Sequence, residues 1–308
     1  MSHLFGPVPS RRLGLSLGVD LIPPKTCTYD CLYCEVDPTT HLTRRREAYH
    51  VEDIIRELQD YLASPPTALD YVTLAGSGEP TLNLGLKDII MAVKSLTATP
   101  VAVLTNGSLL YLPEVRSDVA KADVILPSLD AGREETLRRV NRPRSGLTLD
   151  LLVAGLKALR REFAGQIWLE VMLLRGLNDG EEELTALKGL LGDIAPDKVQ
   201  LNTAVRPVAE ETAQPLSREE MEEIAVFFGK GVEVIAGARR TPPERLAAAD
   251  QDFLRMLARR PMTAGDLAQA LGLSLAQVRE RLRQLIKAGA ISRDVHRDQD
   301  FYRSLLTP

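Results

Sequence analysis

The sequence predicts an α/β fold, an open and partial barrel of about six β/α units, followed by a small winged-helix-like domain. Apolar strand-like and helix-like segments alternate up to residue 236, and glycine or polar residues follow most of the strands. Such alternation indicates βαβ units and a parallel sheet, and about six units are too few for the closed eight-unit barrel. The composition then changes after a segment rich in arginine and proline. We therefore expect a barrel domain at 1–236, a linker at 237–247 and a winged-helix-like domain at 248–308.

Each predicted strand is a short apolar segment bounded by turn residues. The expected strands are 13–22, 71–75, 100–104, 123–126, 166–174, 198–202 and 232–235. Each predicted helix places apolar residues on one face. The expected helices are 51–63, 85–97, 113–120, 132–140, 148–163, 180–192 and 218–229. Because right-handed crossovers connect parallel strands, the loops after the strands should meet at one edge of the sheet, where barrels bind their ligands.

The C-terminal segment has the order of a winged-helix domain, three helices followed by a β-hairpin. The expected elements are helices at 249–259, 262–272 and 274–288, and strands at 289–293 and 300–304. The third helix is in the recognition position.

Basic residues gather in the third helix and the hairpin, which carry seven Lys or Arg and four Asp or Glu, a local charge of +3. Arg279, Arg283 and Lys287 are the candidate contacts for a nucleic acid or another partner. RNA binding, peptide or protein binding, and a structural or dimerising role are the three interpretations of this domain.

Composition and charge restrict the function classes. Hydrophobic residues make up 44% and charged residues 26% of the 308 residues, values typical of a globular protein. A net charge of -4 gives no overall basic field, so nucleic-acid binding would need a local patch. No run approaches the roughly 18 apolar residues of a membrane span, and the N-terminus lacks an apolar signal core. We therefore expect a cytoplasmic protein with reduced thiols and no membrane partner.

The three cysteines of the chain, Cys27, Cys31 and Cys34, lie close together in one predicted loop. Structural cysteines are usually dispersed along a fold, and an odd number argues against a disulfide framework. Three thiolates cannot complete a tetrahedral zinc site without a fourth ligand, for which His41 and His50 are candidates. An iron–sulfur cube fits the spacing better, because closely spaced thiolates hold such clusters and three ligands leave one iron open. Zinc binding and a structural role are the alternatives.

The pattern Cys-x-x-x-Cys-x-aromatic-Cys, with Tyr33 as the aromatic residue, resembles the radical S-adenosylmethionine (SAM) superfamily. The resemblance implies a [4Fe-4S] cluster held by the three cysteines, with SAM bound at the open iron, and a six-unit partial barrel. It also implies that an external one-electron reductant drives the cleavage of SAM to methionine and a 5′-deoxyadenosyl radical, which abstracts hydrogen from a substrate.

The loop Gly76-Ser77-Gly78-Glu79-Pro80 resembles the Gly-Gly-Glu-Pro turn that holds the amino group of SAM in that superfamily. Its glycines permit close backbone approach, and Ser77 departs from the double glycine. Glu79 suits an ammonium group, although backbone carbonyls could make the contact instead.

Polar residues that end the next two strands are further candidates for contacts to the ribose or the carboxylate of SAM. They are Thr105, Asn106, Ser128 and Asp130. An ordinary turn is the alternative for Asn106. Tyr33 could shield the cluster or contact the adenine, with core packing as the alternative.

Four polar residues are candidates for substrate contacts. Glu170 lies within an apolar strand, where a buried carboxylate needs a partner. Asn202 and Arg206 lie at the end of the next strand, and Lys25 precedes the cysteines. Each is a lone polar residue, so an ordinary structural role is the alternative.

Three further stretches, 5–14, 74–82 and 199–207, resemble the branch of the superfamily near the enzymes of wyosine formation on transfer RNA. Those enzymes carry additional cysteines for a second cluster, which this chain lacks. The first hypothesis is a radical SAM enzyme of the oxidoreductase or transferase type that modifies RNA, with transfer RNA as the first candidate. The alternatives are an enzyme that modifies a peptide or protein bound by the winged helix, and a non-enzymatic iron–sulfur or zinc sensor that binds DNA.

Overall fold

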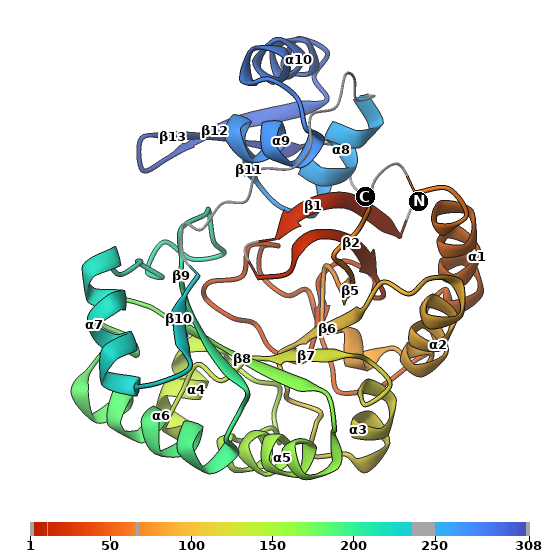
Figure 1. Ribbon diagram of the computed structural model, residues 1–308. Coiled ribbons are helices and arrows are strands. Elements are labelled where there is room, and N and C mark those ends of the chain that lie inside the picture. The colour runs from red at the N-terminus through yellow and green to blue at the C-terminus, as the bar shows by residue number, and fades with distance from the viewer. Residues whose placement is uncertain (1–2, 11, 66–67, 236–249, 306–308) are drawn as a thin grey trace.

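The computed structural model describes residues 3–10, 12–65, 68–235 and 250–305; the predicted linker at 237–247 lies outside them. Within these residues the largest sheet has eight strands, with helices along its outer side (Figure 1). The strands in sheet order are β1 (Leu4–Ser10), β2 (Gly14–Asp20), β5 (Tyr71–Ala75), β6 (Val101–Thr105), β7 (Val124–Pro127), β8 (Gln166–Leu173), β9 (Lys198–Thr203) and β10 (Val232–Val234). All pairs from β2 to β10 are parallel, and β1 and β10 form the two edges. The predicted open, partial barrel is confirmed.

The predicted barrel strands agree with the structure to within two residues at each end, but β1 was not predicted. It pairs antiparallel with β2, and the register shifts between Phe5 and Val8. Its sequence, Leu-Phe-Gly-Pro-Val-Pro-Ser, contains two prolines, which cannot donate to a sheet and are tolerated at an edge. This composition hides the strand from a periodicity argument.

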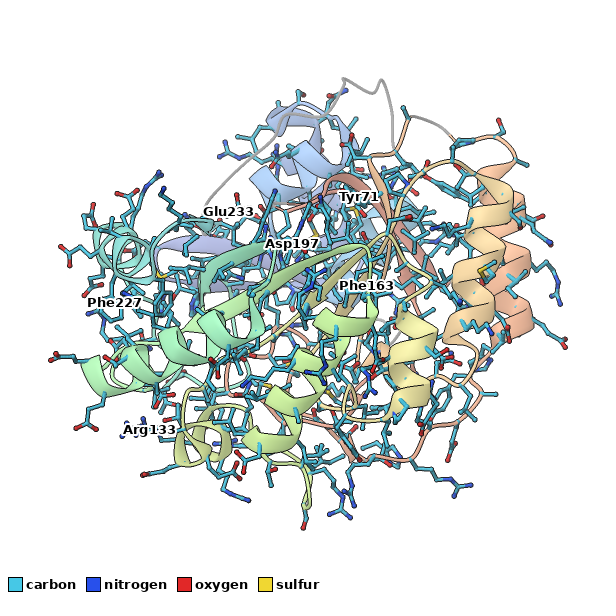
Figure 2. The ribbon with its side chains drawn as sticks, turned by 60° about the horizontal axis from the view of Figure 1, so that its bottom comes forward. Tyr71, Arg133, Phe163, Asp197, Phe227 and Glu233 are labelled. Carbon is cyan, nitrogen blue, oxygen red and sulfur yellow. The ribbon has the colours of Figure 1, made fainter. Side chains whose placement is uncertain are left out.

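The helices that follow the parallel strands complete six β/α units in the described part of the chain. They are α1 (Val51–Leu62), α2 (Leu86–Leu96), α3 (Pro113–Val119), α4 (Glu134–Val140), α5 (Leu149–Glu162), α6 (Glu181–Ile194) and α7 (Arg218–Phe228). Each turns an apolar face to the sheet; in α1, Ile54 and Leu58 are fully buried in the main core. In Figure 2, Phe163 and Asp197, which follow α5 and α6, lie at the end of the sheet where β8 and β9 begin.

Two short strands, β3 (Thr26–Cys27) and β4 (His41–Leu42), pair in the loop that joins β2 to α1, and a short 3₁₀ helix (Pro80–Leu82) follows β5. These elements lie beyond the C-terminal ends of β2 and β5. The cysteine loop therefore sits at the edge of the sheet where the strand-end loops gather.

The C-terminal domain contains helices α8 (Asp250–Arg259), α9 (Ala264–Leu271) and α10 (Leu275–Lys287) and a sheet of β11 (Met262–Thr263), β13 (Gln299–Ser304) and β12 (Ile291–His296). It has its own core, which includes Phe253, Leu257 and Leu282, and Val8 of β1 packs against this core. The predicted arrangement of three helices and a hairpin is confirmed. Figure 1 shows this domain next to β1, at one edge of the large sheet.

None of the helices in the described part of the chain has the length and apolar character that crossing a membrane requires.

Candidate functional site

The cysteine loop is fixed to the glycine-rich loop that follows β5. The N–H of Lys25 donates to the carbonyl of Ser77 (2.8 Å), and the N–H of Glu79 donates to the carbonyl of Thr26 (3.1 Å). A Cβ on Gly78 would lie 1.9 Å from the carbonyl oxygen of Thr26. The close approach of these two loops therefore requires glycine at this position.

The three cysteines are free, partly buried thiols. Burial raises the pKa of Cys27 to about 12 and that of Cys34 to about 11, and it raises the pKa of Cys31 well above its usual value. Such thiols need the positive charge of a metal to become thiolates. The side-chain amides of Asn106 and Asn141 donate to the sulfur atoms of Cys27 and Cys31, each at 3.6 Å. Three clustered thiols with amide donors fit the ligand set of an iron–sulfur cluster.

The histidines considered as zinc ligands lie on other elements. His41 is exposed in β4. His50 precedes α1, where its ring lies 5.2 Å from that of His3 and its Nδ1 is 3.9 Å from a carboxylate oxygen of Asp53. Among the described residues, no group of three or more His, Cys, Asp or Glu side chains is arranged to hold a single metal ion. His50 therefore faces residues of α1 and the N-terminus.

Glu79 is buried, and its carboxylate accepts four hydrogen bonds from the chain itself. One oxygen accepts from the N–H (3.0 Å) and hydroxyl (2.5 Å) of Thr81 and from the hydroxyl of Thr105 (2.6 Å). The other accepts from the N–H of Asn106 (2.7 Å). Burial raises the pKa of Glu79, and these donors oppose the rise. Because a carboxylate has about four acceptor positions, Glu79 fixes the loop to the end of β6 and has little capacity for a further donor.

Asp130, in the loop after β7, lies in a buried network with Tyr33 and Asn141. One carboxylate oxygen accepts from the Tyr33 hydroxyl and from the Asn141 amide (2.7 Å), and the other accepts from the N–H of Met172 (2.8 Å). Burial raises the pKa of Asp130 to about 6, and the hydrogen bond from Tyr33 opposes the rise. Since the amide of Asn141 also reaches the sulfur of Cys31, the network joins β7, β8 and the cysteine loop.

Ser77 replaces a glycine of the family pattern and has a structural partner in Asp20, the last residue of β2. The carboxylate of Asp20 accepts from the N–H (3.1 Å) and the hydroxyl (2.7 Å) of Ser77. It also pairs with Arg259 at the end of α8. Gly76 has a φ of 137°, and a Cβ there would lie 2.0 Å from Asp20. The loop between β5 and the 3₁₀ helix is thus fixed to β2 and to the C-terminal domain.

The polar residues at the ends of β6 and β7 lie at the same edge of the sheet, as predicted. The side-chain amide of Asn106 donates to the hydroxyl of Thr28 (2.7 Å) in the cysteine loop. The N–H of Ser128 donates to the carbonyl of Thr105 (3.1 Å). Asn106 is therefore more than a turn residue, because it connects the end of β6 to the cysteine loop.

Two of the four substrate candidates, Glu170 and Asn202, are brought together. One oxygen of Glu170 accepts from the amide of Asn202 (2.8 Å), and the other pairs with Arg12 (2.5 Å). The buried carboxylate in the apolar strand β8 thus has the partners that its burial requires.

The other two substrate candidates, Arg206 and Lys25, have different partners. Arg206 lies 3.0 Å from Glu35, directly after Cys34, and Arg260 of the C-terminal domain lies 3.5 Å from the same oxygen. The ammonium group of Lys25 is 3.8 Å from Asp37.

The three predicted partner-binding residues, Arg279, Arg283 and Lys287, are exposed on α10. Arg283 pairs with Glu280 at 2.8 Å on the same helix. The arginines of the β12–β13 hairpin form ion pairs or hydrogen bonds with other residues of the chain. These residues are Arg293, Arg297 and Arg303.

Three residues of the site were missed from the sequence: Arg12, Asp20 and Asn141. Arg12 lies in the stretch 5–14, which indicated only a family resemblance. Asp20 is a charged residue at the end of an apolar strand, and that position could have indicated a site residue. Asn141 follows α4 and precedes Arg142-Pro143, a position that suggests only a helix end.

Comparison with known proteins defines the class. A family model described as the radical SAM superfamily matches residues 21–187, and one described as a helix-turn-helix domain matches residues 251–293. The first match covers more than half of the chain, and the chain therefore belongs to the radical SAM superfamily. It is an enzyme, and its cofactors are those of the superfamily, SAM and an iron–sulfur cluster. The alternative of a sensor without turnover is not supported.

The most informative relatives by sequence are proteins named UPF0026. The chain is 36% identical to UPF0026 protein MJ1312 of Methanocaldococcus jannaschii, over 75% of this chain and 72% of that protein. It is 34% identical to a UPF0026 protein of Helicobacter pylori, over 85% of each. It is also 39% identical to GTPase Obg of Brachyspira hyodysenteriae over 95% of this chain, but it spans only 44% of the length of that protein.

Two solved structures are similar in fold. TYW1 with a lysine-pyruvate adduct bound has a TM-score of 0.51 and 16% identity, over 73% of this chain and 75% of that chain. A radical SAM methyltransferase from Sphaerobacter thermophilus has a TM-score of 0.53 and 18% identity, over 72% and 66%, respectively. The predicted fold class is thus confirmed by comparison as well as by topology.

Proposed function

We propose that this radical SAM enzyme holds its [4Fe-4S] cluster through Cys27, Cys31 and Cys34, binds SAM at the adjoining strand-end loops, and modifies RNA, with transfer RNA as the first candidate. The observation that carries the proposal is the direct hydrogen bonding between the cysteine loop and the loop from Gly76 to Glu79. The bound cofactors supply a 5′-deoxyadenosyl radical once an external reductant provides one electron.

The residues of this chain bind and orient the cofactors. Glu79 holds the glycine-rich loop so that its backbone carbonyls can accept from the amino group of SAM. Asn106 and Asn141 donate to sulfur, and such hydrogen bonds tune the potential of iron–sulfur clusters. Thr105, Ser128 and Asp130 lie at the same strand ends and are proposed to position the rest of SAM. A cluster held by reduced thiolates also favours a cytoplasmic protein.

RNA is proposed as substrate from the charge and position of α10. Arg279, Arg283 and Lys287 are exposed on the helix that winged-helix domains use for recognition. Phosphate contacts by such residues give an affinity that depends on salt. The stretches that resemble wyosine-forming enzymes support the same substrate class.

The cluster assignment is tested by replacing each cysteine. Cys27→Ala, Cys31→Ala and Cys34→Ala should each remove most of the bound iron and abolish release of 5′-deoxyadenosine, because two thiolates cannot hold the cube in this loop. Iron content, the visible spectrum and chromatography after anaerobic reconstitution are the measurements. Ser95→Ala on the exposed side of α2 is the control and should retain iron. A cysteine variant with full iron and full SAM cleavage would contradict the assignment.

The RNA assignment is tested by charge reversal on α10. Arg279→Glu with Arg283→Glu should weaken retention of transfer RNA at least tenfold and reduce the dependence of log K on log salt by about 0.7–0.9 per lost contact. Arg218→Glu with Lys230→Glu, exposed on or beside α7, makes the same change in net charge and should have little effect. Equal retention by both double variants would exclude α10 as the RNA-binding surface. Loss of binding to a co-purified peptide instead would favour the peptide alternative.

A further inference from the structure

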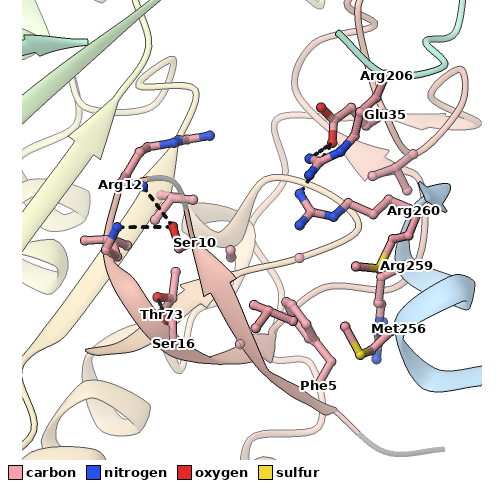
Figure 3. Close-up of a pocket in the computed structure, with 18 residues that line it drawn as sticks. Phe5, Ser10, Arg12, Ser16, Glu35, Thr73, Arg206, Met256, Arg259 and Arg260 are labelled. Atoms are coloured by element: carbon pink, nitrogen blue, oxygen red, sulfur yellow. Dashed lines mark hydrogen bonds and ion pairs between the residues drawn. The ribbon is translucent and has the colours of Figure 1, made fainter. Parts of the chain in front are cut away.

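A cavity of about 250 Å³ lies between the barrel and the C-terminal domain (Figure 3). Strands β1, β2 and β5 contribute Phe5, Ser16 and Thr73 to its wall, and the C-terminal domain contributes Met256 and Met262. The hydroxyl groups of Ser16 and Thr73 are hydrogen-bonded to each other. The C-terminal domain is therefore a wall of this cavity rather than an independent module.

The cavity adjoins the candidate cofactor site. Glu35 and Val36, which line it, directly follow the cluster ligand Cys34, and Gly76 of the glycine-rich loop also lines it. A group bound there is next to both loops that hold the cofactors. This position is suited to a substrate.

The C-terminal domain is attached on both sides of the cavity. Arg259 pairs with the buried Asp20 at the end of β2. Arg297 in the hairpin turn donates to the carbonyl of Ala204 (3.2 Å) and to the side chain of Gln214 (2.7 Å), in the loop after β9. The domain thus contacts the end of β2 and the loop after β9, in opposite parts of the open barrel.

The polar part of the wall is cationic. Four arginines line the cavity, whereas Glu35 alone among the described carboxylates does so. The arginines are Arg12, Arg206, Arg259 and Arg260. The partners of two of them, Glu170 for Arg12 and Asp20 for Arg259, lie outside the lining. These ion pairs therefore present their positive ends to the cavity. Arg206 and Arg260 share the single carboxylate of Glu35, which leaves one positive charge in excess between them. Both features favour an anionic group there.

The apolar part of the wall includes a flat aromatic surface. The Phe5 ring crosses β2 at Gly18, where a Cβ would lie 2.1 Å from the ring, so glycine is needed for this position. The guanidinium of Arg259 lies 5.6 Å from the centre of the same ring, and Met256 lies beside it in Figure 3. Flat apolar groups pack well on such a surface.

We propose that this cavity binds the group that the enzyme modifies, and that this group has an apolar face and carries a carboxylate or a phosphate, which Arg206 and Arg260 bind. The inference rests on the proposed radical SAM function and adds the chemistry of its substrate. A cavity of about 250 Å³ fits a single residue, nucleotide base or small organic acid, not a folded macromolecule. The C-terminal domain then determines specificity through Arg260 and Met256.

The test uses the full-length, anaerobically reconstituted protein, first without SAM and then with SAM added, and three probes of similar size: phenyl phosphate, benzoate and the neutral benzyl alcohol. Titration calorimetry and saturation-transfer NMR measure their binding. Phenyl phosphate or benzoate should bind at least tenfold more tightly than benzyl alcohol, and Arg260→Gln or Arg206→Gln should remove that preference. Met256→Trp should fill the cavity and weaken all three probes. Arg218→Gln on α7 is the control and should change nothing.

Displacement of a bound anionic probe by a single-stranded oligonucleotide would place the group within RNA, and simultaneous binding of both would indicate a free organic acid; either supports the proposal. Equal affinity for benzyl alcohol and the anions in the unmodified protein would overturn it. So would displacement of the probe by added SAM, since the cavity would then belong to the cofactor. Probe binding needs no turnover. Failure of SAM cleavage would therefore contradict the proposed function, whereas the substrate chemistry of the cavity is decided by probe binding alone.

Discussion

Glu79 and Asp130 are carboxylates that were candidates for contacts to SAM. In the structure Glu79 accepts four hydrogen bonds from the chain itself and Asp130 accepts three. Burial of a carboxylate is costly unless it is hydrogen-bonded, and each of these residues lies among backbone N–H, hydroxyl and amide donors. Their first role is therefore to position the loops that follow β5 and β7. Under the proposed function, the backbone carbonyls of the glycine-rich loop rather than Glu79 contact SAM, and Asp130 has an acceptor position left for it.

The pKa of Asp130 leads to a prediction on stability. Asp130 has a pKa of about 6 in the folded protein against 3.8 in the unfolded chain. At pH values between these two pKa values, the folded protein therefore keeps a proton on Asp130 that the unfolded chain has lost. The stability supplied by this proton is complete below pH 4 and is lost as the pH rises through 6. The difference in pKa corresponds to about 3 kcal/mol.

Asp130→Asn removes this titration. The measured quantity is the difference in free energy of unfolding between the unmodified, iron-free protein and this variant. That difference should fall by up to about 3 kcal/mol between pH 4 and pH 7. Urea unfolding at a series of pH values measures this difference. A constant difference over that range would show that Asp130 is not protonated in the folded state.

At the level of elements, the site depends on the contact between the cysteine loop and the glycine-rich loop after β5. Gly78 is a point of close approach between them, since a Cβ there would meet the backbone carbonyl of Thr26. Backbone atoms cannot move aside as a flexible side chain can. The contact is therefore sensitive to a single methyl group.

Gly78→Ala should destabilise the protein by about 1–3 kcal/mol and reduce iron loading, because the cysteine loop must move. Gly189→Ala, in the middle of α6 with no atom within 4 Å of the added Cβ, is a matched control. It should be neutral or stabilising by up to about 1 kcal/mol, since alanine favours a helix. Thermal unfolding and iron analysis of both variants measure the effects, and equal behaviour of the two would contradict the loop contact.

At the level of the whole molecule, arginines of the C-terminal domain meet carboxylates of the barrel. Arg259 reaches Asp20, Arg260 reaches Glu35 and Arg303 reaches Asp37. The first of these pairs is the most buried, with exposed side-chain fractions of 15% for Arg259 and 2% for Asp20. Because Asp20 also holds Ser77, docking of the C-terminal domain is coupled to the glycine-rich loop.

Arg259→Met should cost about 3–5 kcal/mol of stability, because it leaves the Asp20 carboxylate buried without its cation. Hydrogen exchange of residues 74–80 should increase in this variant, and Asp20→Asn should recover part of the loss in the double variant. Arg218→Met, which removes an exposed pair with Glu222, is the control and should change stability by less than about 0.5 kcal/mol. Additive effects of the Arg259 and Asp20 substitutions would exclude the coupling.

Much of the site was predictable because its signals are local. The cysteine spacing and the glycine-rich loop each lie within a few consecutive residues, and the alternation of strands and helices places their loops at one edge. The partners of Glu79, Asp130 and Glu170 were not predictable. Thr81, two residues from Glu79, is the near neighbour among these partners. The others lie between 11 residues away, as Asn141 does from Asp130, and 158 residues away, as Arg12 does from Glu170.

The sequence by itself determined the α/β class, the six β/α units, the winged-helix order and the three thiols, because periodicity and spacing are set by neighbouring residues. Only the tertiary structure decided that β1 adds an antiparallel edge, that the carboxylates of the site are used by the chain itself, and that the C-terminal domain forms a wall of the cavity beside the cysteine loop. Arg259 and Asp20 are 239 residues apart in the sequence, and contacts at such separations are fixed by packing, which no local pattern records.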